Sequence, residues 1–292
     1  MTERTPPPHD DTVPHPLDNP VLSSLTGPHA GFAEQRGRIL RYPVEVCPFL
    51  ALPDEPDEAD WADAAELAGP GGLLPLARGQ ISAPPGWKVT VIGEGVQMTG
   101  DDLTAAADPQ AVVLGPSDVP EMLDLAGRTK PGPFLKRTIE LGTYLGLRHE
   151  GTLVAMAGER LHPAGWAEIS AVCTDPAWRG RGLATRLVRV LGAQIRARGE
   201  IPFLHALAAN MTAIRLYEDL GFRHRRTMQF AVAWVPQARL TPGARVDVDT
   251  HDHQNAIGTR SVVTLPSRAY TPTVEPSWSS FSSFPIDIDD RR

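Results

Sequence analysis

A glycine-containing run in the second half of the chain has the residue types that bind phosphate groups. It reads Asp175-Pro-Ala-Trp-Arg-Gly-Arg-Gly-Leu-Ala184, follows a short segment rich in β-branched and small residues, and precedes apolar residues at helical spacing. The order strand, loop, helix places unpaired main-chain N–H groups and a partial positive charge at the start of the helix. Because glycines let a phosphate approach the main chain closely, we expect this loop to bind a pyrophosphate.

The loop differs from two common phosphate-binding sequences. No Lys-Ser or Lys-Thr pair follows it, as in a Walker loop, and it lacks the Gly-x-Gly-x-x-Gly of dinucleotide folds. Taken alone, it also fits a solvated turn, so its interpretation depends on the next part of the chain.

A second motif follows the next predicted strand, Ile201 to Leu207. Asn210 stands at a helix N-cap position, and Gly221 takes the position just after the end of the same predicted helix. Apolar residues fall on one face of this helix, and Tyr217 lies among them. A tyrosine on such a face is more often part of a core than of a catalytic site.

Together the two motifs resemble the GNAT superfamily of acyl-CoA-dependent N-acyltransferases. Arg179 to Ala184 read Arg-x-x-Gly-x-Ala, and Asn210 to Phe222 read Asn-x-x-Ala-x-x-Leu-Tyr-x-x-x-Gly-Phe. The resemblance covers about residues 110–236. It implies an α/β fold of the α+β kind, with a mixed sheet whose central strands splay apart.

The resemblance extends to the elements that precede the two motifs. We expect a first strand at 111–114, a first helix at 119–126, and a second helix at 134–141 after the break Lys130-Pro-Gly-Pro. Segments 143–149 and 152–161 are predicted to form an antiparallel hairpin around a Glu150-Gly151 turn, leading into the strand that ends at Thr174.

The resemblance also implies which residues hold acetyl-CoA as co-substrate, with no metal. Main-chain groups of the splayed strand would contact the pantetheine arm, the loop amides would hold the pyrophosphate, and a helix-capping asparagine would contact the same ligand. The residues concerned are Val172, Cys173 and Thr174 on the strand, Arg179, Gly180, Arg181, Gly182, Leu183 and Ala184 in the loop, and Asn210.

Acyl transfer from a thioester to an amine needs a proton for the departing thiolate and removal of a proton from the amine. By motif position, Tyr217 would donate to the thiolate. Glu168, at the start of the strand ending at Thr174, is our candidate base, and a solvent-facing role is the alternative. Other candidates are Glu140, Glu159, Tyr144 and His205. Because no His-plus-acid arrangement is visible beside Cys173, we expect direct transfer rather than an acyl-enzyme.

Charge is unevenly distributed along the chain. The net charge of the chain is −7, which argues against nucleic acid as a partner. The segment from Arg179 to Arg226, in contrast, is basic, because it contains ten arginines and only three acidic residues. Most of these arginines fit a solvated helix surface. We assign attraction of a polyanionic cofactor to Arg179 and Arg181 only.

The 292 residues divide into four predicted parts. Proline crowds residues 1–25, and Pro, Ser, Thr and Asp dominate 237–292, so both are expected to be disordered tails. Residues 26–105 are expected to form a small α/β subdomain, with strands at 38–42, 73–77 and 87–92 and a helix within 53–68, beside the GNAT-like domain at 106–236.

Two further absences in the sequence bear on location and redox state. No apolar run could cross a bilayer and the N-terminus lacks a hydrophobic signal, so we expect a cytoplasmic protein without a membrane partner. Two distant cysteines, Cys47 and Cys173, suggest neither a disulfide framework nor a zinc site.

The sequence thus favours an N-acetyltransferase acting on a primary amine of a small molecule, amino acid or peptide. A GNAT-like protein that binds coenzyme A for sensing or scaffolding, without turnover, is the alternative. An unrelated nucleotide-binding module is a third. The sequence names neither the acceptor nor the oligomeric state.

Overall fold

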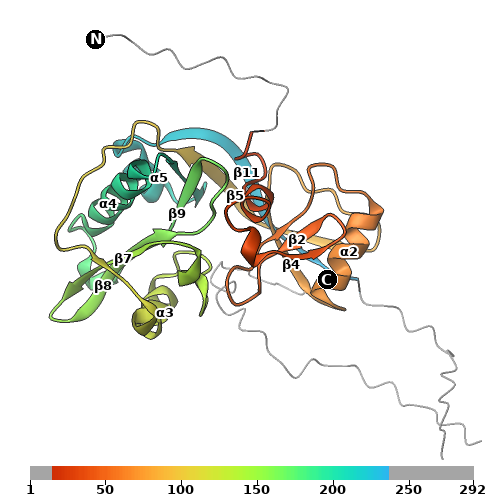
Figure 1. Cartoon of the computed structure of the whole chain (residues 1–292), viewed down its shortest axis with the longest axis horizontal. Helices are drawn as coiled ribbons and strands as arrows, with labels where there is room; N and C mark the ends of the chain where they lie inside the picture. Colours follow the sequence, from red (N-terminus) through yellow and green to blue (C-terminus); the bar gives the residue numbers. More distant parts are fainter. Residues whose placement is uncertain (1–14, 237–292) are drawn as a thin grey trace, which may run out of the picture.

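Two sheets and five helices make up the part of the chain that the computed structural model describes, residues 15–236 (Figure 1). The helices are α1 (Pro20–Leu25), α2 (Glu58–Ala68), α3 (Val119–Thr129), α4 (Leu183–Ala197) and α5 (Met211–Asp219). The strands are β1 (Glu34–Arg36), β2 (Ile39–Arg41), β3 (Leu50–Ala51), β4 (Leu73–Arg78), β5 (Lys88–Thr99), β6 (Val112–Val113), β7 (Tyr144–His149), β8 (Thr152–Glu159), β9 (Trp166–Thr174), β10 (Ile201–Leu207) and β11 (Arg223–Trp234).

The large sheet has the strand order β4-β11-β5-β10-β9-β8-β7-β6, and the small sheet has the order β1-β2-β3. In the large sheet β9 and β10 run parallel, whereas the other neighbouring strands are antiparallel. Because parallel neighbours need a crossover, helix α4 connects β9 to β10. The glycine loop therefore lies between a central strand and the start of a helix, as predicted.

The hairpin predicted before β9 is confirmed. Strands β7 and β8 pair antiparallel and are joined by Glu150 and Gly151, whose φ angles are +48° and +83°. Positive φ at both turn residues matches the twist of the two strands.

Helices cover both faces of the large sheet. Helix α4 buries Leu183, Leu187, Leu191 and Ile195 against β7 to β10, whereas its arginines are half-buried and lie outside this apolar cluster. Helix α3 packs Met122, Leu125 and Ala126 on the opposite face, together with Tyr144 and Cys173. Figure 1 shows α4 and α5 on one side of the strands and α3 on the other.

Helix α5 begins and ends as the sequence predicts. The Asn210 side chain accepts a hydrogen bond of 3.2 Å from the Ala213 N–H, which caps the first turn. At the other end, Gly221 has φ +96°, and its N–H and that of Phe222 donate to the carbonyls of Glu218 and Tyr217, each at 2.9 Å. This Schellman motif packs the Phe222 ring edge-on against Tyr217, with centroids 5.8 Å apart.

The expectation of disorder for residues 1–25 needs correction over 15–25, while residues 1–14 lie outside the described residues. Helix α1 is capped by Asn19 and buries Val21 and Leu25, and the turn before it buries Leu17, in a cluster with Tyr42 and other apolar residues. These three residues recur every four positions, which is helical spacing. Proline-rich composition concealed that signal. The predicted tail at 237–292 also lies outside the described residues.

The helix expected at 134–141 is replaced by a short 3-10 turn at Thr138–Leu141. Its polar groups bond to the N-terminal part of the chain instead: the Arg137 N–H donates to the Glu45 carbonyl at 3.0 Å, and the Thr138 hydroxyl donates to the Val46 carbonyl at 2.7 Å. Long-range contacts have displaced the local helical pattern here. The first strand, expected at 111–114, is the two-residue β6.

The large sheet extends across the boundary expected at residues 105 and 106. Strand β5 pairs with both β10 and β11, and β4 pairs with β11, so part of the expected N-terminal subdomain lies in this sheet. In Figure 1 the long strands β5 and β11 run between the N-terminal elements and the helix-covered half of the sheet.

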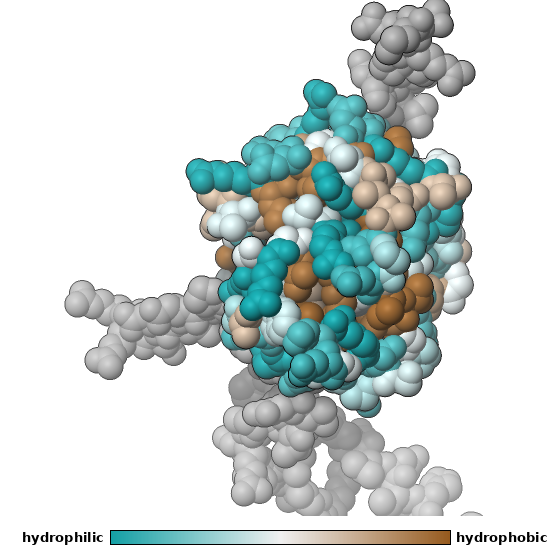
Figure 2. Space-filling model, turned by 90° about the vertical axis from the view of Figure 1, so that its left-hand side faces the viewer, coloured by the Kyte–Doolittle hydropathy of each residue, from teal (hydrophilic) through white to brown (hydrophobic). Residues whose placement is uncertain are grey.

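The outer end of the large sheet is β6, where Val112 and Val113 are exposed. Figure 2 views the molecule from the side of α3, α4 and β8 and shows small apolar patches separated by polar side chains. Within residues 15–236, no helix has the length and hydrophobicity needed to cross a membrane.

Gly221 provides a test of the α5 terminus. We expect Gly221→Ala to lower the free energy of unfolding by about 2 kcal/mol or more, because φ is positive and an added Cβ would collide with the Asp102 carbonyl oxygen. In the control Gly127→Ala, on an exposed helical position with nothing within 4 Å of the added Cβ, stability should stay equal or rise by up to about 1 kcal/mol. Urea denaturation measures both. Equal effects in the two variants would contradict the assignment.

Candidate functional site

Strands β9 and β10 pair at one end and separate at the other. Their pairing is limited to Trp166 with Ile201, Ala167 with Pro202, and Glu168 with Phe203. Beyond that point β9 continues beside β8, and β10 continues beside β5. The facing edges of the two strands therefore leave main-chain groups without a strand partner, and the predicted splay is confirmed.

Glu168 lies at the vertex of this opening, in the last β9–β10 pair. Its fully buried carboxylate accepts hydrogen bonds from Arg160 at 2.9 and 2.6 Å and contacts the His205 Nδ1 of β10 at 2.7 Å. Burial alone would raise the pKa of this carboxyl, but Arg160 and His205 lower it to about 2. The Glu168–His205 contact thus joins the two strands at the point where they part, and the ion pair with Arg160, which follows β8, compensates the buried carboxylate.

A β-bulge in β9 turns the main chain along the opening. Cys173 pairs with Met156 and Ser170 with Gly158, so Ala171 and Val172 together face the single residue between Met156 and Gly158. Ala171 has φ +53°. Because a bulge re-aims the residues around it, Ala171 and Cys173 pack on the α3 side while Val172 packs against the α4 core.

A cavity of about 200 Å³ occupies the opening. Its walls come from both faces of the sheet, because Tyr217 belongs to the core under α4 and Phe49 borders the N-terminal core. Of the residues predicted to bind coenzyme A, Val172 and Asn210 line this cavity. Cys173 and Thr174 do not line it, whereas their neighbours Ser170 and Ala171 do.

The glycine loop begins beside the end of β9. The Asp175 carboxylate accepts from the Ala177 N–H at 2.9 Å and caps a 3-10 turn at Pro176–Trp178. Gly180 and Gly182 follow with φ of +75° and +71°, and Gly182 is the N-cap of α4. Nothing lies within 4 Å of a Cβ added at either glycine, so backbone conformation, and not crowding, requires glycine at these positions.

The main-chain amides of Gly180 to Ala184 are available to a ligand. The first helical bond of α4 runs from the Arg186 N–H to the Gly182 carbonyl at 3.1 Å. Among residues 15–236, the N–H groups from Gly180 to Ala184 form no hydrogen bond. Unpaired donors at a helix N-terminus are suited to a phosphate group.

The two arginines of the loop carry uncompensated charge. Arg181 stacks on the Trp178 ring at 4.3 Å from its centroid, and Arg179 donates to the Thr174 carbonyl at 3.4 Å. Neither forms an ion pair with another described residue, whereas Arg186 and Arg198 on the same helical segment pair with Asp108 and with two glutamates. Arg189, Arg196 and Arg215 also form no ion pair with another described residue, so it is the position of Arg179 and Arg181 in the loop itself that favours them for phosphate attraction.

Tyr217 faces the cavity from α5. Its side chain is about nine-tenths buried, and its hydroxyl forms no side-chain hydrogen bond with another residue of 15–236. Burial, with a smaller effect of nearby Cys173, raises the pKa of the phenol to about 12. The phenol therefore stays protonated near neutral pH and can donate a hydrogen bond or a proton into the cavity.

The expectation that Glu168 acts as a general base does not fit this geometry. It is bound on both carboxylate oxygens, does not line the cavity, and its lowered pKa makes it a weak proton acceptor. The other acidic candidates are also engaged, since Glu140 pairs with Arg137 and buried Glu159 pairs with His162 and Arg198. Tyr144 is buried beneath α3 and does not line the cavity.

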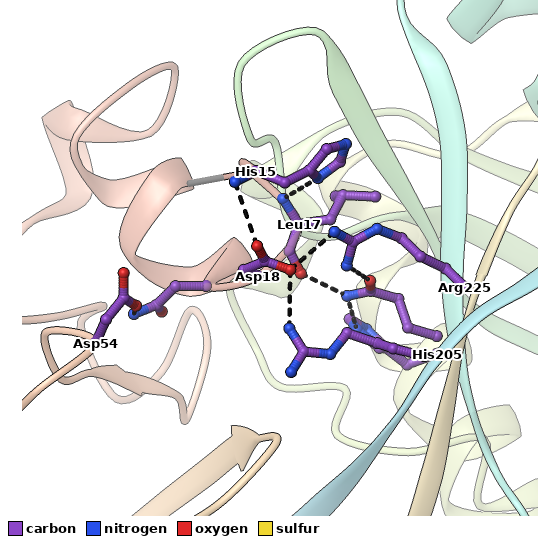
Figure 3. Close-up of polar contacts among 9 residues, drawn as sticks. His15, Leu17, Asp18, Asp54, His205 and Arg225 are labelled. Carbon is purple, nitrogen blue, oxygen red and sulfur yellow. Dashed lines mark hydrogen bonds and ion pairs between the residues drawn. The ribbon is translucent and has the colours of Figure 1, made fainter. Parts of the chain in front are cut away.

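His205 lines the cavity but both ring nitrogens are engaged (Figure 3). The Gln97 side-chain amide donates to the Leu17 carbonyl at 2.9 Å and contacts the His205 Nε2 at 3.1 Å, while Arg225 donates to the Gln97 oxygen at 2.8 Å. In this arrangement Nε2 accepts from Gln97 and the Nδ1 proton points to Glu168. His205 is therefore a hydrogen-bonded wall residue.

Three parts of this network were missed from the sequence. The segment around Leu17 gave no signal, because its partner Gln97 is distant in the chain. Arg160 gave none because it meets Glu168, eight residues away, only through the folded arrangement of the strands. Gln97 did carry one, since a polar residue between Val96 and Met98 in an apolar strand must find a buried partner. Figure 3 shows Asp18, next to Leu17, in contact with Arg225, and the same carboxylate accepts a hydrogen bond from Arg226 at 2.9 Å.

Comparison with known proteins gives consistent matches. The family model described as FR47-like protein matches residues 144–232. A crystal structure from Novosphingobium aromaticivorans DSM 12444, assigned to the GNAT family of acetyltransferases, is 42% identical, with a TM-score of 0.69. That match covers 75% of this chain and 98% of the other.

Two curated proteins match shorter parts. The N-alpha-acetyltransferase RimI of Mycobacterium tuberculosis is 40% identical over 83 residues, 27% of this chain and 51% of RimI. The uncharacterized protein ML0378 of Mycobacterium leprae is 32% identical over 166 residues, 51% of this chain and 46% of that protein. The chain thus spans about half the length of the curated relatives it matches.

The role of Glu168 at the vertex can be tested by stability measurements. We expect Glu168→Gln to lower the free energy of unfolding at pH 7 by about 3 kcal/mol, because it leaves the buried Arg160 charge unpaired. The control Glu140→Gln removes an exposed pair and should cost less than about 1 kcal/mol. Urea denaturation of both variants gives the comparison.

The stabilisation that the Glu168 carboxylate provides should depend on pH in a defined direction. Because the folded-state pKa of about 2 lies below the ordinary value of 4.5, the stabilisation by Glu168 is complete above about pH 4.5 and is lost as pH falls toward 2. The stability gap between the wild type and Glu168→Gln should narrow over that interval. A variant as stable as wild type at pH 7 would show that the buried ion pair does not stabilise the vertex.

Proposed function

The chain belongs to the GNAT family of acetyltransferases, and from this we propose that it transfers an acetyl group from acetyl-CoA to a primary amine of a small molecule, amino acid or peptide. The observation that carries the proposal is the cavity between the parted strands, with the Tyr217 phenol on one side and unpaired main-chain donors at the start of α4. An opening of this kind can accept an extended ligand as a sheet edge accepts a strand.

Coenzyme A would be held mainly by main-chain groups. The amides of Arg179, Gly180, Arg181, Gly182, Leu183 and Ala184 would bind the pyrophosphate, and the side chains of Arg179 and Arg181 would add attraction for its charge. The edge of β9 from Val172 through Cys173 to Thr174 would hydrogen-bond the pantetheine amides, and Asn210 would contact the same arm. Exposed arginines without ion-pair partners fit this assignment.

Tyr217 would supply the proton that the reaction needs at sulfur. As the amine nitrogen forms its bond to the thioester carbonyl carbon and the carbon–sulfur bond breaks, the phenol donates its proton to the departing thiolate. The amine nitrogen would lose its proton to solvent water, and a proton from solvent would return to the phenolate, so that the enzyme is regenerated. A pKa raised to about 12 keeps the phenol protonated before the reaction, so that it can act as a donor to the developing thiolate. No carboxylate lines the cavity in residues 15–236, so we assign removal of the amine proton to no carboxylate of that part of the chain.

Direct transfer is favoured over an acyl-enzyme. Burial raises the pKa of the Cys173 thiol to about 11, and this thiol does not line the cavity. A buried protonated thiol is a poor nucleophile. The name of the matched RimI protein, an N-alpha-acetyltransferase, supports an amine acceptor and includes the peptide N-terminus among the candidates.

We expect Tyr217→Phe to lower kcat by about 10²-fold, because the variant lacks the proton donor, while the affinity for coenzyme A stays within about twofold. The control is Tyr144→Phe, which removes another buried phenol that has no hydrogen-bond partner and does not line the cavity. It should leave kcat unchanged. A thiol-release assay with acetyl-CoA against polyamines, amino acids, aminoglycosides and peptide N-termini measures turnover, and calorimetry measures coenzyme A binding.

The outcomes separate the candidate functions. Equal kcat for Tyr217→Phe and wild type would remove Tyr217 from the chemistry. Coenzyme A binding without turnover on any amine would favour the sensing or scaffolding alternative. Absence of binding would contradict both.

A further inference from the structure

The part of the cavity away from α5 is apolar and is built largely by the N-terminal half of the chain. Phe49 comes from the segment before β3, Pro75 and Leu76 from β4, and Ile92 from β5. These residues lie outside the region 144–232 that the FR47-like model matches. The chain therefore adds its own wall to a cavity whose other side belongs to the family region.

Two local features shape this wall. On β5, Gly93 pairs with Phe230 and Val91 pairs with Ala231, which leaves Ile92 as the bulged residue between them. Ile92 lines the cavity, while Val91 is 52% exposed to solvent. On β11 the Phe230 ring lies over Gly95, where an added Cβ would collide with it. The bulge and the glycine thus bring two large apolar side chains to the same space.

The charges around the cavity have one sign. Its charged lining residues are Lys130 and Arg160, and no Asp or Glu lines it among the described residues. Arg160 is already paired with Glu168, and its guanidinium lies 5.1 Å from the centre of the Phe49 ring. Lys130 is exposed and forms no ion pair with a residue in 15–236. A second cationic group placed here would be desolvated with no carboxylate to compensate it.

From this wall we infer that the acceptor is a primary amine attached to an aromatic or aliphatic apolar group, with no second positive charge in the part that enters the cavity. A carboxylate on the acceptor is compatible with the wall, because Lys130 offers it a partner. Polyamines and aminoglycosides are disfavoured. The inference rests on the proposed function and narrows its acceptor class.

The most direct comparison uses amines that differ by one charge. We expect kcat/KM for pentylamine and for 2-phenylethylamine to exceed that for 1,5-diaminopentane by at least tenfold, in a thiol-release assay with acetyl-CoA at fixed pH and ionic strength. Higher or equal kcat/KM for 1,5-diaminopentane, or for spermidine, would overturn the inference while leaving the proposed function intact.

Ile92 and its neighbour provide a matched pair of variants. Ile92→Glu places a carboxylate in the wall and should lower the ratio of kcat/KM for pentylamine to that for 1,5-diaminopentane by at least tenfold. Val91→Glu adds the same charge on the same strand at a solvent-exposed position and should leave the ratio unchanged. Both substitutions fall on positions that are not fully buried, and thermal unfolding checks that each variant folds. A ratio that moves equally in both variants would also contradict the inference.

If the protein transfers no acetyl group, amine binding measured by calorimetry still tests the inference. Pentylamine and 1,5-diaminopentane are titrated by calorimetry into the protein saturated with coenzyme A. Tighter binding of pentylamine together with no thiol release from any amine would support the apolar site while the proposed function fails. Tighter binding of the diamine, or no heat with either amine, would overturn the inference.

Discussion

The site depends on a buried ion pair at the point where β9 and β10 part. Glu168 is the last residue of β9 that pairs with β10, and its carboxylate contacts Arg160 and the β10 residue His205. An uncompensated charge at this depth would be strongly unfavourable, so the three side chains fix one another. These side chains lie where β9 and β10 stop pairing, and the cavity opens beyond that point.

Each neighbouring element adds one component to the opening. The bulge at Ala171 turns the main chain of β9, and the loop with Gly180 and Gly182 delivers the first turn of α4 to the end of the same strand. The Schellman motif at Gly221 holds Phe222 against Tyr217, which gives the phenol a fixed place in the wall. These components are local in sequence, and the parallel β9–β10 pair brings them together.

The N-terminal part of the chain serves the same opening. Leu17 accepts a hydrogen bond from Gln97, Gln97 contacts His205, and His205 contacts Glu168. The segment around Leu17 is thus connected to the vertex through side chains on β5 and β10. The same half of the molecule supplies Phe49 and Leu76 to the apolar wall, and its strands β4 and β5 belong to the large sheet.

Features set by short-range rules could be predicted from the sequence. The hairpin at Glu150-Gly151, the Asn210 cap and the Gly221 terminus follow from turn and capping preferences, and the resemblance supplied the splayed strands. Features that depend on contacts formed only in the folded chain could not be predicted from the sequence. The segment 134–141 bonds to Glu45 and Val46 instead of forming a helix, and Glu168 meets Arg160 only through the sheet register. Composition also outweighed the helical spacing of Leu17, Val21 and Leu25.

The central claim is that the parted strands and the α4 N-terminus together receive coenzyme A. Hydrogen–deuterium exchange of the full chain, with and without saturating coenzyme A, tests it at the level of main-chain amides. Slower exchange should appear in peptides covering 169–174 and 179–184, the two segments whose donors lie open along β9 and at the start of α4. Bound coenzyme A with unchanged exchange in both segments, and protection elsewhere, would contradict it.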